Sequence, residues 1–357
     1  YKKDINNQLD YDIIGRFSNE FRTDAVNSLV LSDIAENERG TPYTINQNFS
    51  YFYTANENNI FALEVKHQLQ DEDPFYVASL ENNPNNNDDL GLDRSNLFYN
   101  LEQDRKVKSN QLDAKLDYYN ILNAKSNLNF VVGTILSKQN FDSKFFQILD
   151  NGNTFDPNPT IPGNTDPRTT NDTEYNFTDI YAGLRYRLKS GIFTFTPGFT
   201  VHSYSVKNTQ YQTEILKDTF QKFFPEFNMI AQFKQSESLR FSYKQEVNFT
   251  DVNQIARGIV ANSYNSFFFG NEGLTNASLH NVNLNYSSFN LFNYTNVFAR
   301  INYRKTIDQI NRNTIFEPGS VVSSSTSINS PLDNESFTAF GRVGKTFNKI
   351  KTSLGAN

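Results

Sequence analysis

Apolar and polar side chains alternate with a period of two along most of this sequence. In residues 297–304, for example, Val297, Ala299 and Ile301 alternate with Arg300 and Asn302. Successive side chains of a β-strand point to opposite faces, so this period predicts strands with one apolar and one polar face. Helical spacing fits none of these segments. The same pattern occupies seven other segments: 111–119, 127–137, 179–188, 192–202, 225–234, 239–247 and 280–286.

The connections between these segments distinguish the kinds of sheet that they can build. A soluble sandwich also alternates, with its apolar face inward. Here short turns alternate with long polar loops, which is typical of outer-membrane barrels with tight periplasmic turns and long outer loops. The predicted short turns are 56–59, 123–126, 189–191, 235–238, 287–290 and 348–351. The predicted long loops are 70–96, 139–178, 205–222 and 251–278.

The stretch 291–347 is predicted to be one very long hairpin that runs out through 305–316, turns at 317–320 and returns near 336–347. We therefore predict an all-β fold, an antiparallel transmembrane β-barrel of roughly 12–15 strands, as one domain over residues 1–357. The sequence starts without Met or a signal peptide and stops inside a predicted strand. A fragment is expected, with the plug and the last strands missing, because lipid cannot satisfy open sheet edges.

Composition is consistent with a barrel and narrows the classes of function. The chain contains 33 Phe and 19 Tyr, yet its mean hydropathy is −0.60, because the aromatic residues stand singly between polar ones. An AT-rich genome would produce a similar bias. The absence of Cys excludes disulfides and thiolate metal sites, and the net charge of −6 argues against a nucleic-acid partner. No catalytic motif is found, so an enzyme is not expected.

A series of short motifs occurs in the C-terminal half. Phe224-Pro225 opens one predicted strand, Leu239–Tyr243 forms the next, Asn253-Gln254-Ile255 follows, and Gly270-Asn271-Glu272-Gly273-Leu274 precedes the strand 279–286. In this order they resemble the barrel domain of TonB-dependent receptor-like outer-membrane β-barrel proteins, with weaker similarity back to about residue 110. Glu272 stands where that family usually has Pro. The resemblance implies a plug and a TonB box, which we expect in a region that precedes this sequence.

An aromatic segment in the last long loop, 264–269, is the predicted outer recognition surface, because aromatic side chains anchor interfaces. The alternative is packing against neighbouring loops or contact with lipid headgroups. The predicted recognition residues are Tyr264, Phe267, Phe268, Phe269, Gly270 and Asn271.

Six basic residues fall on the polar faces of the predicted strands, which point into the lumen of a barrel. They could bind a plug, pair in the wall with Glu226 and Glu246, or meet an anionic solute; plug or wall pairing is favoured. These residues are Arg185, Arg187, Arg240, Lys244, Arg300 and Arg304.

No metal site is predicted. His67, His202 and His280 lie on separate predicted strands. The loops 82–96 and 150–166 are rich in Asn and Asp, and such loops can hold Ca²⁺. They lack the spacing of an EF-hand, so solvated turns are favoured and no cofactor is expected.

The leading functional hypothesis is a receptor or transporter barrel for TonB-dependent uptake of a nutrient. The alternative is a structural barrel subunit of an outer-membrane assembly that holds partner lipoproteins and transports nothing. A third reading is a soluble sugar-binding β-protein without a membrane girdle. The expected partners are outer-membrane lipid, the TonB system and a possible surface lipoprotein.

Overall fold

Nearly all of the described chain is β-strand, arranged in a 17-stranded antiparallel sheet and a separate four-stranded sheet. Side chains are described from residue 37 onward, apart from that of Glu214. The described helix, α1 (Val252–Ile255), is neither long nor apolar enough to span a membrane. The computed structural model describes residues 2–4, 9–23, 26–80, 90–161, 163–164, 166, 168–290, 292, 294–316, 322–347 and 352–356.

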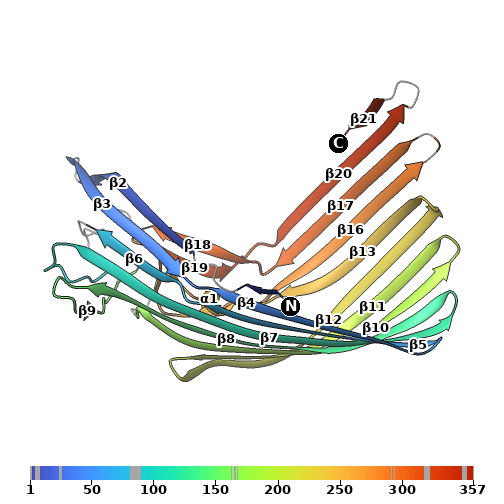
Figure 1. Ribbon diagram of the computed structural model, residues 1–357, viewed down its shortest axis with the longest axis horizontal. Helices are drawn as coiled ribbons and strands as arrows, with labels where there is room; N and C mark the ends of the chain where they lie inside the picture. Colours follow the sequence, from blue (N-terminus) through green and yellow to red (C-terminus); the bar gives the residue numbers. More distant parts are fainter. Residues whose placement is uncertain are drawn as a thin grey trace.

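The large sheet is a curved wall in which most neighbouring strands are consecutive in sequence (Figure 1). Its central and C-terminal strands are paired in the order β7 (Tyr99–Asn123), β8 (Ser126–Ile148), β10 (Thr170–Ser190), β11 (Phe193–Gln210), β12 (Thr213–Lys234), β13 (Glu237–Asn248), β16 (Ala277–Asn290), β17 (Thr295–Ile307), β20 (Asn334–Phe347) and β21 (Thr352–Ala356). The two-residue β9 (Thr154–Phe155) pairs with the end of β8.

The N-terminal strands extend the wall beyond β7 in two tiers. In one tier β7 pairs with β6 (Phe75–Leu80), β6 with β3 (Val26–Gly40) and β3 with β2 (Leu9–Thr23). In the other, β7 pairs with β5 (Asn59–Glu72), β5 with β4 (Tyr43–Asn56) and β4 with β1 (Lys2–Asp4). β1 and β2 follow each other along one interrupted wall strand, and the same holds for β3 and β4 and for β5 and β6. Counted so, and without β9, the 17 strands make thirteen wall strands, which confirms the predicted barrel wall of 12–15 strands. Over the described residues the wall is an open trough (Figure 1).

Tight turns gather at one end of the wall and long connections at the other (Figure 1). Two residues or fewer join the partners at four predicted turns: β4 to β5, β7 to β8, β10 to β11 and β12 to β13. The predicted turn at 348–351 lies outside the described residues. This arrangement is that of short periplasmic turns and longer outer connections.

Three of the predicted long loops are wrong in whole or part, because the strands continue beyond the apolar outer belt, with inward apolar side chains that pack against other parts of the chain. The predicted loop 205–222 is a hairpin, in which Tyr211 and Gln212 join β11 to β12 with φ of 49° and 61°. Positive φ at both positions is the requirement of a type I′ turn. In the predicted loop 139–178, only residues 149–169 connect β8 to β10, and in 70–96 the wall continues through β6.

The predicted long hairpin at 291–347 is also wrong in its outer half, because it leaves the wall. Asp308, with φ of 55°, follows β17, and the strands β18 (Ile310–Phe316) and β19 (Ser323–Asn329) pair with each other. β19 continues into a second sheet, parallel to β15 (Ser266–Phe269), which pairs with β14 (Val260–Ser263). The predicted turn at 317–320 lies outside the described residues.

The outer face of the wall is an apolar belt. On β11 the outward positions from Phe193 to Val201 are all Phe, Pro or Val, a length of roughly 26 Å along the strand. Val132 is 51% exposed and Ile301 38% exposed, and neither lies in a buried cluster. Such exposure of large apolar residues over a whole face is expected where lipid replaces water.

An inner module, the described parts of residues 249–276 and 308–333, packs on the polar, concave face of the wall. One cluster joins Ile259, Ala261 and Phe267 of the module to residues of β6, β7 and β8. A second joins Val252 and Ile255 of α1 to residues of β8, β10, β11 and β12. In Figure 1, β18 and β19 lie between the two arms of the curved wall. The module therefore occupies the lumen at the loop end.

Candidate functional site

Carboxamide side chains of the wall hold the inner module through paired hydrogen bonds. Gln103 Nε2 donates to the carbonyl of Ala261 (3.0 Å), and the Ala261 amide donates to Gln103 Oε1 (2.7 Å). Asn171 pairs in the same way with Gly258, at 3.1 and 2.7 Å. A side-chain amide offers one acceptor and a donor, as a peptide does, so it completes the hydrogen bonds of a buried loop backbone. These contacts fix the module in one position.

Close backbone approach makes glycine necessary at two points of the module. A Cβ at Gly258 would stand 2.0 Å from the carbonyl oxygen of Thr170, and one at Gly270 would stand 2.4 Å from the carbonyl oxygen of Ala256. The Gly270 amide donates to that same Ala256 carbonyl at 2.7 Å. The predicted recognition residue Gly270 is thus a close-contact position between β15 and the end of α1.

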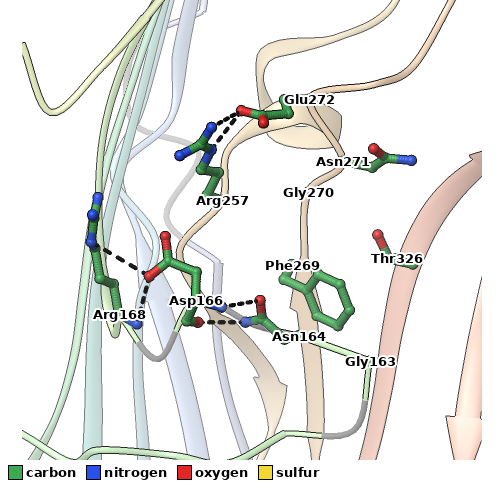
Figure 2. A pocket seen from close by; sticks show the side chains of 10 residues that line it. All are labelled: Gly163, Asn164, Asp166, Arg168, Arg257, Phe269, Gly270, Asn271, Glu272 and Thr326. Atoms are coloured by element: carbon green, nitrogen blue, oxygen red, sulfur yellow. Dashed lines mark hydrogen bonds and ion pairs between the residues drawn. The ribbon is translucent and has the colours of Figure 1, made fainter. Parts of the chain in front are cut away.

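A cavity of about 720 Å³ opens at the loop end, between the inner module and the segment that leads into β10 (Figure 2). A second cavity of about 460 Å³ adjoins it and shares Arg168 and Arg257. The first cavity, called the outer cavity below, is lined by Gly163, Asn164, Asp166, Arg168, Arg257, Phe269, Gly270, Asn271, Glu272 and Thr326.

Each arginine of the outer cavity has a carboxylate partner (Figure 2). Arg257 binds Glu272 through Nε and Nη2, and Arg168 Nε lies 3.4 Å from Asp166. The Arg168 guanidinium also lies 4.1 Å from the ring centroid of Tyr211, a cation–π distance. Burial raises the pKa of Tyr211 above its ordinary value. The fixed charges of the cavity balance, and its groups can both donate and accept hydrogen bonds.

Hydrogen bonds also shape the outer cavity and the cavity beside it. Asn164 Nδ2 donates to the carbonyl of Asp166 (2.7 Å), and the Asp166 amide donates to Asn164 Oδ1 (3.0 Å). These two bonds fix the backbone of Asp166. Thr326 Oγ1 is buried and has no hydrogen-bond partner within the described chain. Gln210, which lines the adjoining cavity, donates to the Ile255 carbonyl (2.9 Å) and accepts from the Arg257 amide (3.1 Å).

The predicted aromatic recognition segment mostly packs inside the module. Phe267 is fully buried, with its ring edge-on to Phe145 at 5.6 Å. Tyr264 packs against the same cluster, and Phe268 lies beneath the Arg312 guanidinium at 5.4 Å. Phe269, Gly270 and Asn271 line the outer cavity. A recognition role for this segment stays a prediction.

Sequence reasoning missed the four charged residues of the outer cavity. Asp166 and Arg168 precede β10, whereas Arg257 and Glu272 lie about 90 to 105 residues later in the module. No periodicity relates them, because only the docking of the module on the wall brings them together. Glu272, which stands where the resembled family usually has Pro, was the one local signal.

The six predicted lumen-facing charges lie on the inner face, in different surroundings. Arg185 binds Glu226 through Nε and donates to Asn129 Oδ1 at 3.1 Å. Lys244 pairs with Glu246 at 2.5 Å, and Arg300 Nε donates to Asn285 at 2.8 Å. The other three have no ion-pair partner in the described part of the chain: Arg187, Arg240 and Arg304.

The described side chains of the two oxygen-rich loops bind groups of the chain, both within and between the loops: the Asp150 amide donates to Asn96 Oδ1 at 2.8 Å. Ser95 donates to Asp93 from its amide and hydroxyl (2.8 and 2.6 Å), and these bonds hold the pKa of Asp93 below its ordinary value. The Asn153 amide donates to Asn151 (2.9 Å). Residues 81–89 of the first loop lie outside the described residues. Within the described residues, no group of three or more His, Asp or Glu side chains is placed to hold a metal ion.

The fold defines the class of this protein. An antiparallel wall with an apolar outer belt, a polar inner face and tight turns at one end is an outer-membrane β-barrel wall. A family model described as "Outer membrane protein beta-barrel family" matches residues 73–357, most of the chain. The chain belongs to that family, and its location is the cell outer membrane.

Solved structures with a similar arrangement include a receptor and two transporters of low sequence identity. The hemophore receptor HasR of Serratia marcescens is 10% identical (TM-score 0.46) and is matched over 95% of this chain and 56% of its own. The copper transporter OprC is 10% identical (TM-score 0.48; 96% and 58%), and the FrpB iron transporter of Neisseria meningitidis is 8% identical (TM-score 0.44; 95% and 58%). The chain thus spans little more than half the length of these proteins. No curated protein matches its sequence.

Proposed function

We propose that this protein is an outer-membrane receptor that captures a nutrient in the outer cavity and passes it through the barrel lumen, driven by the TonB system. The observation that carries this proposal is the docked inner module, which builds a concave polar cavity at the loop end of the lumen. A barrel that served only as a scaffold needs no such cavity in the path of a solute. Binding residues on loops held by a rigid wall are the usual arrangement of a receptor.

The dependence on TonB is supported by the ordered motifs of residues 224–286. Two of them contribute to the proposed site. Gly270 and Asn271 line the outer cavity, and the Asn253-Gln254-Ile255 motif forms most of α1, beside it. The motifs that resemble a TonB-dependent receptor therefore build the module that shapes the cavity.

Removal of one ion pair tests the proposal. Arg257→Ala combined with Glu272→Ala takes both partners away together, so neither is left as an unpaired charge. We expect the barrel to assemble normally and uptake to fall by about tenfold or more, since hydrogen bonds to charged groups contribute roughly 1.5–3 kcal/mol. Growth on a panel of single nutrients is the readout, compared with cells that lack TonB. Lys234→Ala with Glu237→Ala, an ion pair at the tight-turn end, is the matched control.

The alternative function gives a different result in the same experiment. If the protein is a structural subunit, growth on every nutrient is unchanged in the double variant and in cells without TonB. Outer-membrane proteins that co-purify with the wild type would then be lost from the variant. That result would refute uptake as the function.

A further inference from the structure

The inner face of the wall has two halves with different electrostatics. On β5, β7, β10 and β12, five inward charges are joined in one row of ion pairs: Glu64, Lys115, Asp117, Arg185 and Glu226. Lys115 contacts Glu64 at 3.4 Å and Asp117 at 3.1 Å, and Arg185 binds Glu226. These groups form a continuous row of alternating sign across four strands. Both cations of this row, Lys115 and Arg185, therefore have carboxylate partners.

The other half, on β13, β16, β17 and β20, is cationic. The strand register shows that the inward residues of these strands share a face with Glu226. Glu226 lies opposite Lys244 on β13, Lys244 lies opposite Asn281 on β16, and Asn281 lies opposite Arg304 on β17. The carboxylate on this face, Glu246, is bound to Lys244. At the alternate inward positions of these strands the basic residues are Arg240, Lys244, Arg300, Arg304 and Arg342.

Four of these side chains form what we call the arginine strip: Arg240, Arg300, Arg304 and Arg342. All four are exposed, and within the described residues none has a carboxylate partner. Arg240 lies opposite Asn285, which lies opposite Arg300, so these two arginines are roughly 10 Å apart. A net positive strip in a chain of net charge −6 is an uneven distribution of charge.

Neutral hydrogen-bonding groups fill the spaces between the arginines. The inward residues at the centre of β16 are Asn281, Asn283 and Asn285, and Asn302 Nδ2 donates to Asn283 Oδ1 at 2.6 Å. At the loop end of the strip, a cavity of about 310 Å³ lies between the wall and the start of β18. Arg304 lines this cavity together with amide and hydroxyl groups, and no carboxylate does.

We infer that the arginine strip binds a small anionic solute, one that carries carboxylate or phosphate groups, as the solute crosses the lumen. This inference rests on the proposed uptake function and names its class of substrate. Guanidinium groups match carboxylate and phosphate oxygens in a two-pronged geometry. Rings of Arg or Lys are how pores select anions, and a concave wall of one sign raises the local concentration of the opposite ion.

Citrate binding to the purified full-length protein tests this inference, with glucose as a neutral probe of similar size. Isothermal titration calorimetry at low ionic strength should detect binding of citrate but not of glucose. Arg300→Gln and Arg304→Gln should each weaken citrate binding by roughly tenfold, because each removes a charged donor. Raising the salt concentration should weaken it too, as screening reduces attraction between exposed charges. Lys125→Gln, at the turn between β7 and β8, removes the same charge outside the lumen and should change nothing.

Three results would overturn the inference. The first two are equal binding of glucose and citrate, and citrate affinity that is unchanged in both arginine variants. A third is an acidic polypeptide that co-purifies only when the arginines are present while citrate does not bind, since the strip would then be a protein docking surface. Citrate binding is measured without TonB, so it separates the two proposals. Growth independent of TonB with citrate binding intact refutes uptake alone, whereas TonB-dependent uptake without citrate binding refutes the anionic class alone.

Discussion

Neighbouring residues of one wall strand meet two different solvents. Ile301 points outward and is 38% exposed in the chain, which in the membrane means contact with lipid. Arg300, one residue earlier, points into the lumen and donates to Asn285. The same contrast holds on β8 and β10, where Val132 and Leu184 face outward. The side of the strand therefore decides whether a residue must be apolar.

Arginine placed on the outer face should hinder folding into bilayers. We expect Ile301→Arg, Val132→Arg or Leu184→Arg to cost on the order of 2–4 kcal/mol of folding free energy at the bilayer midplane. Arg300→Ala should cost much less, because it removes a side chain from the wet lumen. Urea titration of folding in lipid vesicles measures both. Similar losses for Ile301→Arg and Arg300→Ala would contradict the assigned faces.

At the level of elements, the inner module depends on the wall more than on its own strands. Its described strands β14 and β15 have four residues each, too few to be stable alone. Gln103 and Asn171 replace the missing strand partners by binding the backbone of residues 258–261. These hydrogen bonds therefore add to the two apolar clusters in holding the module on the wall.

Loss of the two carboxamides should release the module without unfolding the barrel. In Gln103→Ala with Asn171→Ala, buried backbone groups of the module lose their partners, at roughly 1–3 kcal/mol for each unsatisfied group. Limited proteolysis should then cut within 249–276 much faster, while the heat-modifiable migration of the barrel stays unchanged. Gln111→Ala, on the same face of β7 and roughly 26 Å away along the strand, is the control. Equal protease resistance in the double variant and the control would show that the carboxamides do not hold the module.

The elements that the sequence predicts are those formed by neighbouring segments. Alternation in 297–304 or 192–202 is visible along one strand, and a short turn shows which strands pair. The parallel pairing of Phe267 with Ser324 joins residues far apart in the chain, so no local pattern indicates it. Gln103 and Asn171 also look like ordinary polar residues on a strand. The barrel wall could thus be predicted from the sequence. The inner module and the outer cavity could not, because they form only when the module docks on the wall.

At the scale of the whole molecule, the chain is a wall with a binding module held inside it. The apolar belt fixes the wall in the outer membrane, the module narrows the lumen at the loop end, and the arginine strip lies on the inner face of β13, β17 and β20. Capture and passage would use different residues, namely those of the outer cavity and of the strip. All of this depends on which face of each wall strand meets lipid.

The most direct test of that orientation uses the absence of Cys from the chain. Single cysteines introduced at each position from 297 to 304 would carry a nitroxide spin label, one position per sample, in lipid vesicles. We predict that collision with oxygen, which partitions into lipid, is high at Val297, Ala299, Ile301 and Tyr303. Collision with a water-soluble nickel complex should be high at Phe298, Arg300, Asn302 and Arg304. The opposite phase, or no alternation with a period of two, would contradict the account.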